Sequence, residues 1–287
     1  MKKTKILSIL LLVFLATGCF KKNSNEKIDI KVSAYPIEFL TKEIYGENAT
    51  VTSIYPNDMN KDYTISEKLL NDYSSTNLFI FNGNESKEND YVYTMFNKNK
   101  KLKIIDSTAS LTYENKIEEL WLDPLNCLTM ANNIKKGFKE YISATYISNK
   151  IDTNYDKLKI KLIQLEADYR EMSNRSNTKN IVVADDLFLY LKKYNINVIS
   201  LEQSKNYTKK TLYDAEKLMK KGEIKVIYVR KGQKLSDTIT KLKDTYNLEI
   251  IELNDLYTLS EDDIKNNKDY FSLMYDNLEL LKKQLYN

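Results

Sequence analysis

Histidine is absent from all 287 residues of this chain. Without an imidazole the protein can form neither a Ser-His-Asp triad nor a Cys-His dyad, and it has no histidine ligand for zinc. Acid–base chemistry would have to use carboxylates, lysines, tyrosines or an internal cysteine. The composition therefore excludes the commonest catalytic arrangements and the commonest zinc sites.

The chain also lacks a large excess of charge of one sign. Its formal net charge is +4, with 44 basic and 40 acidic residues. Lys2, Lys3 and Lys5 lie in a segment that we expect to be removed, which leaves 41 basic residues against 40 acidic ones, or +1. This balance gives no basic surface for nucleic acid, and we expect no nucleic-acid partner. With 42% hydrophobic and 29% charged residues, the chain is typical of a soluble body and not of a multispan membrane protein.

Long hydrophobic runs are missing, apart from one near the N-terminus. Residues 6–16 form an almost unbroken apolar run directly after the three lysines. A membrane-spanning helix needs roughly 20 such residues, so this run is too short to cross a bilayer. A basic start followed by a short apolar run is typical of an export signal.

Small residues at positions 16–18 precede Cys19, and this pattern resembles a bacterial lipobox, with Ala16 in place of the more usual leucine. In such a pattern the cysteine receives lipid and becomes the first residue of the mature protein. We therefore expect a signal peptide over residues 1–18 and a lipidated Cys19 with a polar tether over residues 19–27. The body would be held by its lipid at the extracytoplasmic face of the cell membrane.

Cysteine is scarce as well, since Cys127 is the only other one. If Cys19 carries lipid, Cys127 has no partner within the chain, and a disulfide framework is excluded. We interpret Cys127 as a small buried residue on a helix.

Short β-rich runs alternate with helical segments through the rest of the chain. This alternation predicts parallel sheets with helices on both faces. Strands are expected at residues 28–34, 50–56, 77–83, 101–106, 180–184, 196–201, 224–229 and 248–253. Between them, helices are expected at residues 64–73, where Thr64 and Glu67 form a capping-box pattern, and at residues 187–194.

One helix stands out by its length. Between about residues 153 and 174 the apolar positions follow a 3-4-3-4-3 spacing, which places them along one helix face. We predict an α/β fold: two α/β lobes over residues 28–150 and 177–287, each with a mostly parallel sheet, joined by one long backbone helix over residues 151–176. The seam consists of Tyr155, Leu158, Leu162, Leu165, Tyr169 and Met172.

The only tryptophan, Trp121, follows two acids and precedes an Asp-Pro pair. Proline suits the first turn of a helix and an acid suits its positive end, so Asp123 and Pro124 predict a helix start. We interpret Trp121 as a structural aromatic residue of the lobe.

The order of these segments resembles the zinc- and manganese-type solute-binding proteins of ABC importers. The local matches include SAYPIEFLTKEIYG, ELWLDPLNCLTMANNI and VVADDLFLYLKKYNINVISL, and the resemblance runs from about residue 28 to 285. It implies two α/β lobes on a long helix, a metal ion in the interlobe cleft, an ABC permease as partner and a monomeric, non-enzymatic receptor. A pair such as Glu119 and Asp185 could in principle hydrolyse glycosides, but no nucleophile motif accompanies it.

Members of this family usually hold the metal with three histidines and one carboxylate. The resemblance places Lys61, Glu119 and Asp185 at the histidine positions. It places Asn254 at the closing aspartate, with Asp255 next to it as a one-residue slip. None of the four positions keeps its usual residue. At Arg230 and Lys231, where many relatives carry an acid and a proline, the chain differs as well.

Several interpretations of this cleft are open. Glu119, Asp185 and Asn254 offer oxygen ligands, which suit one divalent ion of the manganese type better than zinc. Protonated Lys61 would oppose a metal, and it could itself bridge Glu119 and Asp185 in place of the ion. The cleft could also take another small solute, such as an amine or zwitterion, or be vestigial. With the ion bridge in place of the metal, the protein could act as a surface adhesin or interaction lipoprotein, or bind another small solute.

Overall fold

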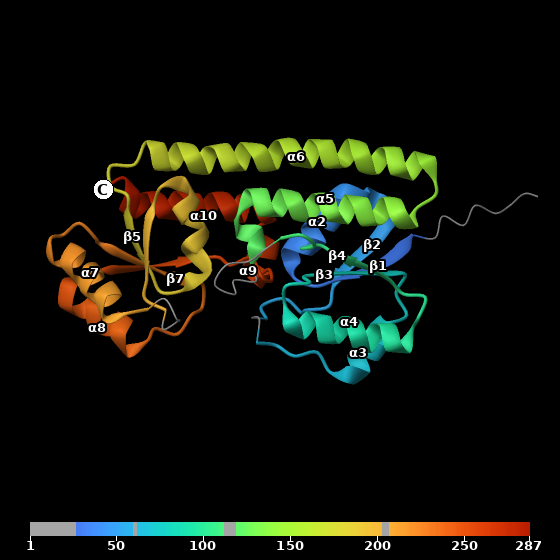
Figure 1. Ribbon diagram of the computed structural model, residues 1–287, viewed down its shortest axis with the longest axis horizontal. Coiled ribbons are helices and arrows are strands. Elements are labelled where there is room, and N and C mark those ends of the chain that lie inside the picture. Colours follow the sequence, from blue (N-terminus) through green and yellow to red (C-terminus); the bar gives the residue numbers. More distant parts are fainter. Residues whose placement is uncertain (1–26, 60–61, 112–118, 203–206) are drawn as a thin grey trace, which may run out of the picture.

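The computed structural model describes residues 27–59, 62–111, 119–202 and 207–287 of the chain. Two parallel sheets of four strands each lie toward the two ends of an elongated body, and one long helix passes along both (Figure 1). The predicted fold class, two α/β lobes joined by a long backbone helix, is therefore confirmed.

The N-terminal sheet has the strand order β2-β1-β3-β4, and each neighbouring pair is parallel. All four residues of β3 are buried. A strand that is apolar on both faces is typical of a parallel sheet covered by helices on both sides. The elements of this lobe are β1 (Ile28–Val32), α2 (Tyr35–Tyr45), η2 (Gly46–Asn48), β2 (Ala49–Ser53), α3 (Glu67–Tyr73), β3 (Leu78–Phe81), α4 (Ser86–Lys98) and β4 (Lys103–Asp106).

The C-terminal sheet repeats this plan with the order β6-β5-β7-β8, again parallel throughout. In both sheets the strand that begins the lobe is an inner strand, and the chain then moves to one edge before it returns. Its elements are β5 (Asn180–Val183), η5 (Asp186–Tyr194), β6 (Asn197–Ser200), α7 (Lys209–Lys220), β7 (Val226–Arg230), α8 (Asp237–Tyr246), β8 (Glu249–Leu253) and α9 (Glu261–Lys265).

A layer of long helices joins the lobes. The helix α6 (Thr145–Asn174) runs along the molecule above α5 (Pro124–Tyr141) and α10 (Tyr270–Leu285) (Figure 1). All six residues of the predicted apolar seam are buried. The helix begins eight residues before the expected start at residue 153, and buried Ile151 extends the seam by one further step of four residues.

Local capping explains where several elements begin. Asp123 caps α5 by accepting the N–H of Leu125 at 2.9 Å, as the Asp-Pro pair predicts. The helix expected from residue 64 begins instead at Glu67, since Ser66 and not Thr64 accepts the N–H of Leu69 at 3.4 Å. The segment 187–194, expected as an α-helix, forms the tighter 3-10 helix η5.

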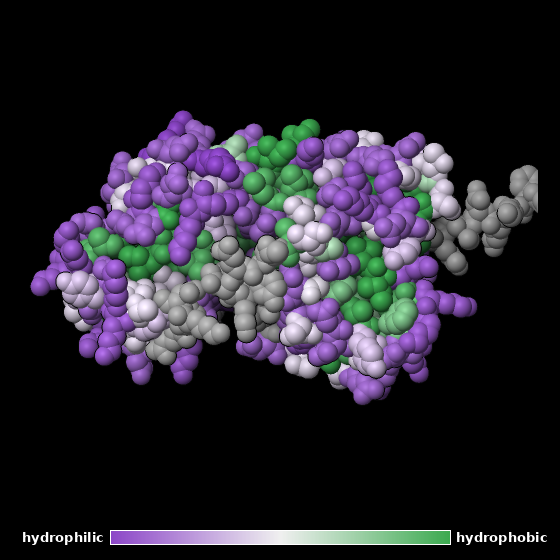
Figure 2. Space-filling model, in the orientation of Figure 1, coloured by the Kyte–Doolittle hydropathy of each residue, from purple (hydrophilic) through white to green (hydrophobic). Residues whose placement is uncertain are grey.

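Among the described residues, no helix is both long enough and apolar enough to cross a bilayer. Figure 2 shows a mostly hydrophilic surface on the face that carries α6. Some hydrophobic colour lies near the middle of this helix, which carries the exposed residues Ile160 and Ile163.

Candidate functional site

The carboxyl ends of three neighbouring strands meet at the edge of the C-terminal sheet that faces the N-terminal lobe. Asp185 lies two residues beyond β5, Arg230 is the last residue of β7, and Asp255 lies two residues beyond β8. Because β7 is paired with β5 on one side and β8 on the other, Arg230 lies between the two acids. Ligands of open α/β sheets bind at this kind of edge.

The Arg230 guanidinium forms ion pairs with three carboxylates from both lobes. Its Nε donates to Oδ2 of Asp185 at 3.0 Å, and its Nη2 forms an ion pair with the same oxygen at 2.8 Å. Its Nη1 donates to Oε1 of Glu119 at 3.0 Å and to Oδ2 of Asp255 at 3.3 Å. The forked geometry of arginine allows it to bridge carboxylates in this way. We call these four residues the Arg230 cluster.

This cluster is well shielded from water. The side chain of Glu119 is 3% exposed, and the other three are between 14% and 18% exposed. Burial lowers the pKa of Arg230, but the carboxylates of Asp185, Glu119 and Asp255 outweigh it and hold that pKa above its usual value. Burial raises the pKa of Asp255, and the guanidinium only partly offsets this. One fixed cation among three acids leaves a formal charge of −2.

Glu119 is held in place by its neighbour Trp121. The Trp121 indole is fully buried and its N–H donates to the main-chain oxygen of Asp255 at 2.8 Å. The main-chain oxygen of Trp121 accepts the hydroxyl of Tyr270 at 2.7 Å. The single tryptophan thus joins the Glu119 segment to the residues that follow β8, and this contact brings an acid of the first lobe to the edge of the second.

Only some of the site residues predicted from the sequence come together in the cleft. Glu119, Asp185 and Asp255 converge on Arg230, whereas the side chain of Asn254 accepts the N–H of Leu256 at 2.8 Å in a local turn. Lys61 and Cys19 lie outside the described residues. Metal binding by Glu119, Asp185 and Asn254 stays a prediction.

The sequence did not identify Arg230 as the centre of the cleft. The signal available in the sequence was its position directly after the strand predicted at residues 224–229. A charged side chain at the end of an inner strand meets the loops that follow the neighbouring strands. A guanidinium there has to find acids, because burial of an unpaired charge is very unfavourable.

A cavity of about 670 Å³ lies beside the cluster, with residues of both lobes in its walls. Asp58 and Asp62 come from the first lobe, and Lys231 and Lys234 lie on the loop after β7. Many of the charges are engaged within the protein; Lys231, for example, pairs with Asp263 at 3.3 Å. The predicted interlobe cleft is therefore present as a polar cavity with Arg230 in its wall.

A second ion cluster joins the lobes behind the cleft. The ammonium of Lys193, on η5, donates to Glu166 of α6 at 2.8 Å and also to the carboxylate of Asp123, which caps α5. The hydroxyl of Tyr194 donates to the same Glu166 at 2.6 Å, and Arg170 pairs with it at 2.8 Å. Together with the Arg230 cluster, these contacts fix the second lobe against the first and against the long helix.

The donor set does not fit zinc. Within the described part of the chain, no group of three or more histidine, cysteine, aspartate or glutamate residues has an arrangement that could hold a metal ion. Cys127 is fully buried, and burial raises the pKa of its thiol to about 12, so it is not a thiolate ligand near neutral pH. The position between the acids is taken by the guanidinium.

Comparison with known proteins gives the family. The sequence profile described as "ZnuA: Zinc-uptake complex component A periplasmic" matches residues 30–284. The zinc-binding lipoprotein AdcA of Streptococcus pneumoniae (strain ATCC BAA-255 / R6) is 24% identical over 320 residues, which cover 99% of this chain and 61% of that protein. The chain thus spans about three fifths of the length of this curated relative.

Solved structures share the fold. The Zn(II)-bound ZnuA-like domain of Streptococcus pneumoniae AdcA matches with a TM-score of 0.75 at 21% identity, over 91% of this chain and all of that one. The laminin-binding protein Lbp of Streptococcus pyogenes matches with a TM-score of 0.73 at 19% identity, over 91% of this chain and 99% of that one. Since the profile spans nearly the whole described body, the chain belongs to the ZnuA family of metal-binding solute-binding proteins.

Proposed function

We propose that this chain is an extracytoplasmic solute-binding lipoprotein in which the Arg230 guanidinium takes the place of the metal ion of its family. The observation that carries the proposal is the convergence of Glu119, Asp185 and Asp255 on Arg230. Among the interpretations drawn from the sequence, this favours an internal ion bridge, and we assign its cation to Arg230.

The charge of the cluster supports this assignment. A divalent ion at the same position would lie against a guanidinium that cannot lose its proton in a protein. Zinc also prefers nitrogen and sulfur ligands, which the described part of the cleft does not offer. We infer that the folded protein does not capture a bare transition-metal ion here.

The interlobe cavity supports a small polar solute as the cargo. Its volume of about 670 Å³ lies within the range of roughly 300–1,000 Å³ that is typical of small-molecule sites. Arg230, Lys231 and Lys234 present cations, while Asp58 and Asp62 present acids from the opposite lobe. A zwitterionic solute or an amine with a second polar group suits this mixed lining.

A hard divalent ion of the manganese type is the second candidate. If Arg230 moved away, Glu119, Asp185 and Asp255 would form a set of three carboxylates, and oxygen ligands suit manganese, magnesium or calcium. This candidate requires the ion to displace a guanidinium from all three of its partners. The adhesin-like alternative rests on the shared fold with a protein named for laminin binding, and on no residue of this chain.

We propose the following organisation for the mature protein. A signal peptide over residues 1–18 is removed, Cys19 carries lipid, and residues 19–27 tether a monomeric body to the cell membrane. The body consists of the lobes 28–150 and 177–287 and the linking helix 151–176, and its partner is an ABC permease. The sequence pattern before Cys19 and the lipoprotein name of the AdcA relative support this organisation.

The test is a metal and ligand analysis of residues 20–287, purified without a histidine tag, which would add the imidazoles that this chain lacks. Elemental analysis and titration calorimetry with Mn²⁺ and Zn²⁺ should show far less than one bound ion per chain. Native mass spectrometry should show a bound small molecule that is lost when Lys231 and Lys234 are both changed to Glu. Stoichiometric manganese in the unaltered protein would instead establish the second candidate.

A further inference from the structure

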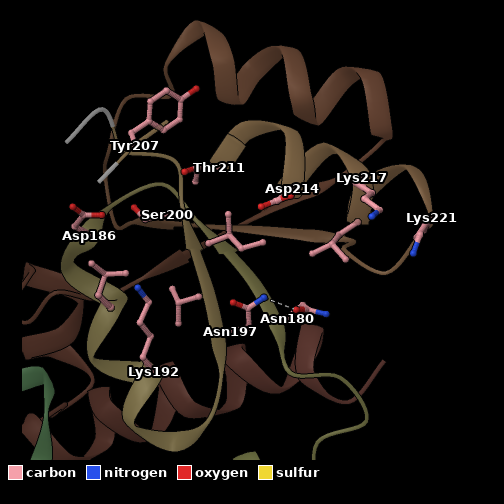
Figure 3. Close-up of a pocket in the computed structure, with 14 residues that line it drawn as sticks. Asn180, Asp186, Lys192, Asn197, Ser200, Tyr207, Thr211, Asp214, Lys217 and Lys221 are labelled. Carbon is pink, nitrogen blue, oxygen red and sulfur yellow. Dashed lines mark hydrogen bonds between the residues drawn. The ribbon is translucent and has the colours of Figure 1, made fainter. Parts of the chain in front are cut away.

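A groove of about 470 Å³ lies on the outer side of the C-terminal lobe, between η5 and α7, and all four residues of β6 line it (Figure 3). It shares no lining residue with the interlobe cavity. It is therefore separate from the cleft that the family uses, and the proposed function does not account for it.

The wall of this groove is the edge of a sheet. In the order β6-β5-β7-β8, the strand β6 is hydrogen-bonded to β5 on one side only. The N–H groups of Asn197 and Leu201 donate toward β5, to Lys179 at 2.7 Å and to Val183 at 2.8 Å. Because direction alternates along a strand, the main-chain groups of Val198 and Ser200 point away from β5. Both residues line the groove, so a second strand would find donors and acceptors there.

Charged side chains of both signs line the groove: Asp186 and Lys192 lie toward one end, and Asp214 lies with Lys217 and Lys221 toward the other. In Figure 3, Asp186 and Ser200 lie at one end, and Lys217 and Lys221 lie at the other, above Asn197. Asp186 is 5% exposed, and its Oδ1 is buried without a hydrogen-bond partner among the described residues. A buried carboxylate oxygen with no partner is costly, and a cationic ligand group in the groove would relieve that cost.

We propose that this groove binds a short extended peptide that pairs with β6 in the antiparallel direction. The strand β6 runs from Asn197, at the lysine end, to Ser200, at the Asp186 end. A peptide with its ammonium at Asp186 and its carboxylate at Lys217 and Lys221 runs the opposite way. Peptides that add a strand to an open edge gain affinity from main-chain hydrogen bonds. At about 3.3 Å per residue, the four residues of β6 match a peptide of about four residues.

The experiment uses the full mature lipoprotein in detergent micelles. A synthetic tetrapeptide library with free termini is mixed with the protein, separated by size exclusion and analysed by mass spectrometry. The best binder is then compared by calorimetry with its N-acetylated, C-amidated and backbone N-methylated forms. We expect each blocked terminus to weaken binding by about tenfold or more, since hydrogen bonds to charged groups contribute strongly, and methylation of the pairing amides to abolish it.

Variants assign each end of the peptide. Asp186→Asn should weaken the binding of the peptide with a free N-terminus and leave the affinity for the N-acetylated peptide unchanged. Lys217→Glu with Lys221→Glu should weaken the binding of the peptide with a free C-terminal carboxylate and leave the affinity for the C-amidated peptide unchanged. Lys209→Glu with Lys220→Glu is the matched control, because these residues are exposed on α7 and do not line the groove.

Four results would overturn the proposal. The first is that no tetrapeptide is enriched, and the second is that the N-methylated peptide binds as tightly as the unmethylated one. The third is that Arg230→Met abolishes binding while the groove variants have no effect. The fourth is that two copies of the chain form a dimer through β6. The comparison of peptide forms does not depend on any variant folding correctly.

Discussion

Both Nε and Nη2 of Arg230 lie within hydrogen-bonding distance of a single oxygen of Asp185, Oδ2, at 3.0 and 2.8 Å. The other oxygen of Asp185 accepts the N–H of Leu187 at 2.9 Å and caps η5. One carboxylate therefore fixes both the guanidinium and the start of the next helical segment. The centre of the cleft is formed by the protein's own side chains.

Replacement of the guanidinium should turn the cluster into a cation site. Arg230→Met leaves three carboxylates without their cation, and breaking a buried ion pair costs about 3–5 kcal/mol. Added Mn²⁺ or Ca²⁺ should then raise the melting temperature of the variant, because an ion that binds only the folded state stabilises it. Thermal unfolding with and without each ion measures this effect.

The control for this variant is Lys231→Met, which removes a neighbouring, half-exposed cation outside the cluster. It should neither lower the stability by more than about 1 kcal/mol nor create a metal response. An Arg230→Met protein as stable as the parent, and insensitive to both ions, would show that the cluster is not the structural centre described here.

The acids of the Arg230 cluster should contribute different amounts to the free energy of unfolding. Asp185→Asn loses a charge-assisted hydrogen bond from Nε and an ion pair with Nη2 at once, so we expect a loss of about 3–4 kcal/mol in the free energy of unfolding. Asp255→Asn should cost only about 1 kcal/mol, since its contact with Arg230 is longer, at 3.3 Å, and burial already raises the pKa of Asp255. Urea unfolding of both variants ranks them. A larger loss for Asp255→Asn would contradict the assigned order.

Glu88 should make stability depend on pH. It is fully buried, its Oε2 accepts the N–H of Asn82 at 2.7 Å, and burial, reinforced by Glu85, raises its pKa to about 8 from 4.5. Between these values the folded state holds a proton that the unfolded chain has lost. Its stabilising contribution is therefore complete below about pH 4.5 and is lost as the pH rises through about 8.

Glu88→Gln should flatten this dependence, which has a limiting slope of about 1.4 kcal/mol per pH unit. Urea titrations from pH 5 to 8 on the parent, on Glu88→Gln and on the exposed Glu47→Gln measure it. If parent and Glu88→Gln give parallel curves, Glu88 does not titrate as described.

Lys193 should hold the lobes together behind the cleft. Lys193→Met leaves the carboxylates of Glu166 and Asp123 without their shared ammonium, and since Lys193 is 25% exposed we expect a loss of about 1–3 kcal/mol. Amide exchange should increase in η5 and in the facing turn of α6. Lys220→Met, at an exposed position of α7, should leave both readouts unchanged. Unaltered exchange in η5 would mean that the cluster does not couple the lobes.

Much of the fold followed from patterns local to the chain. The alternation of strands and helices predicted the two parallel sheets, and the spacing from Tyr155 to Met172 predicted the buried face of α6. Predictions from local sequence patterns were wrong for the start of one helix and for the type of another. Ser66 caps α3 where Thr64 was expected, and a 3-10 helix forms where an apolar run suggested an α-helix. The helix α4 was not predicted at all, because charged and polar residues dilute its apolar face.

By itself the sequence determined that this protein has no imidazole, it predicted two α/β lobes on a long helix, and its resemblance to the family predicted Glu119 and Asp185 at two of the usual ligand positions. Only the tertiary structure decided which cation they meet. Glu119 and Arg230 are 111 residues apart in the chain, and their contact depends on the position of β7 between β5 and β8 and on the anchoring of Trp121. Such a contact has no local signature, because it is fixed by sheet order and by the high free-energy cost of burying a charge without a partner.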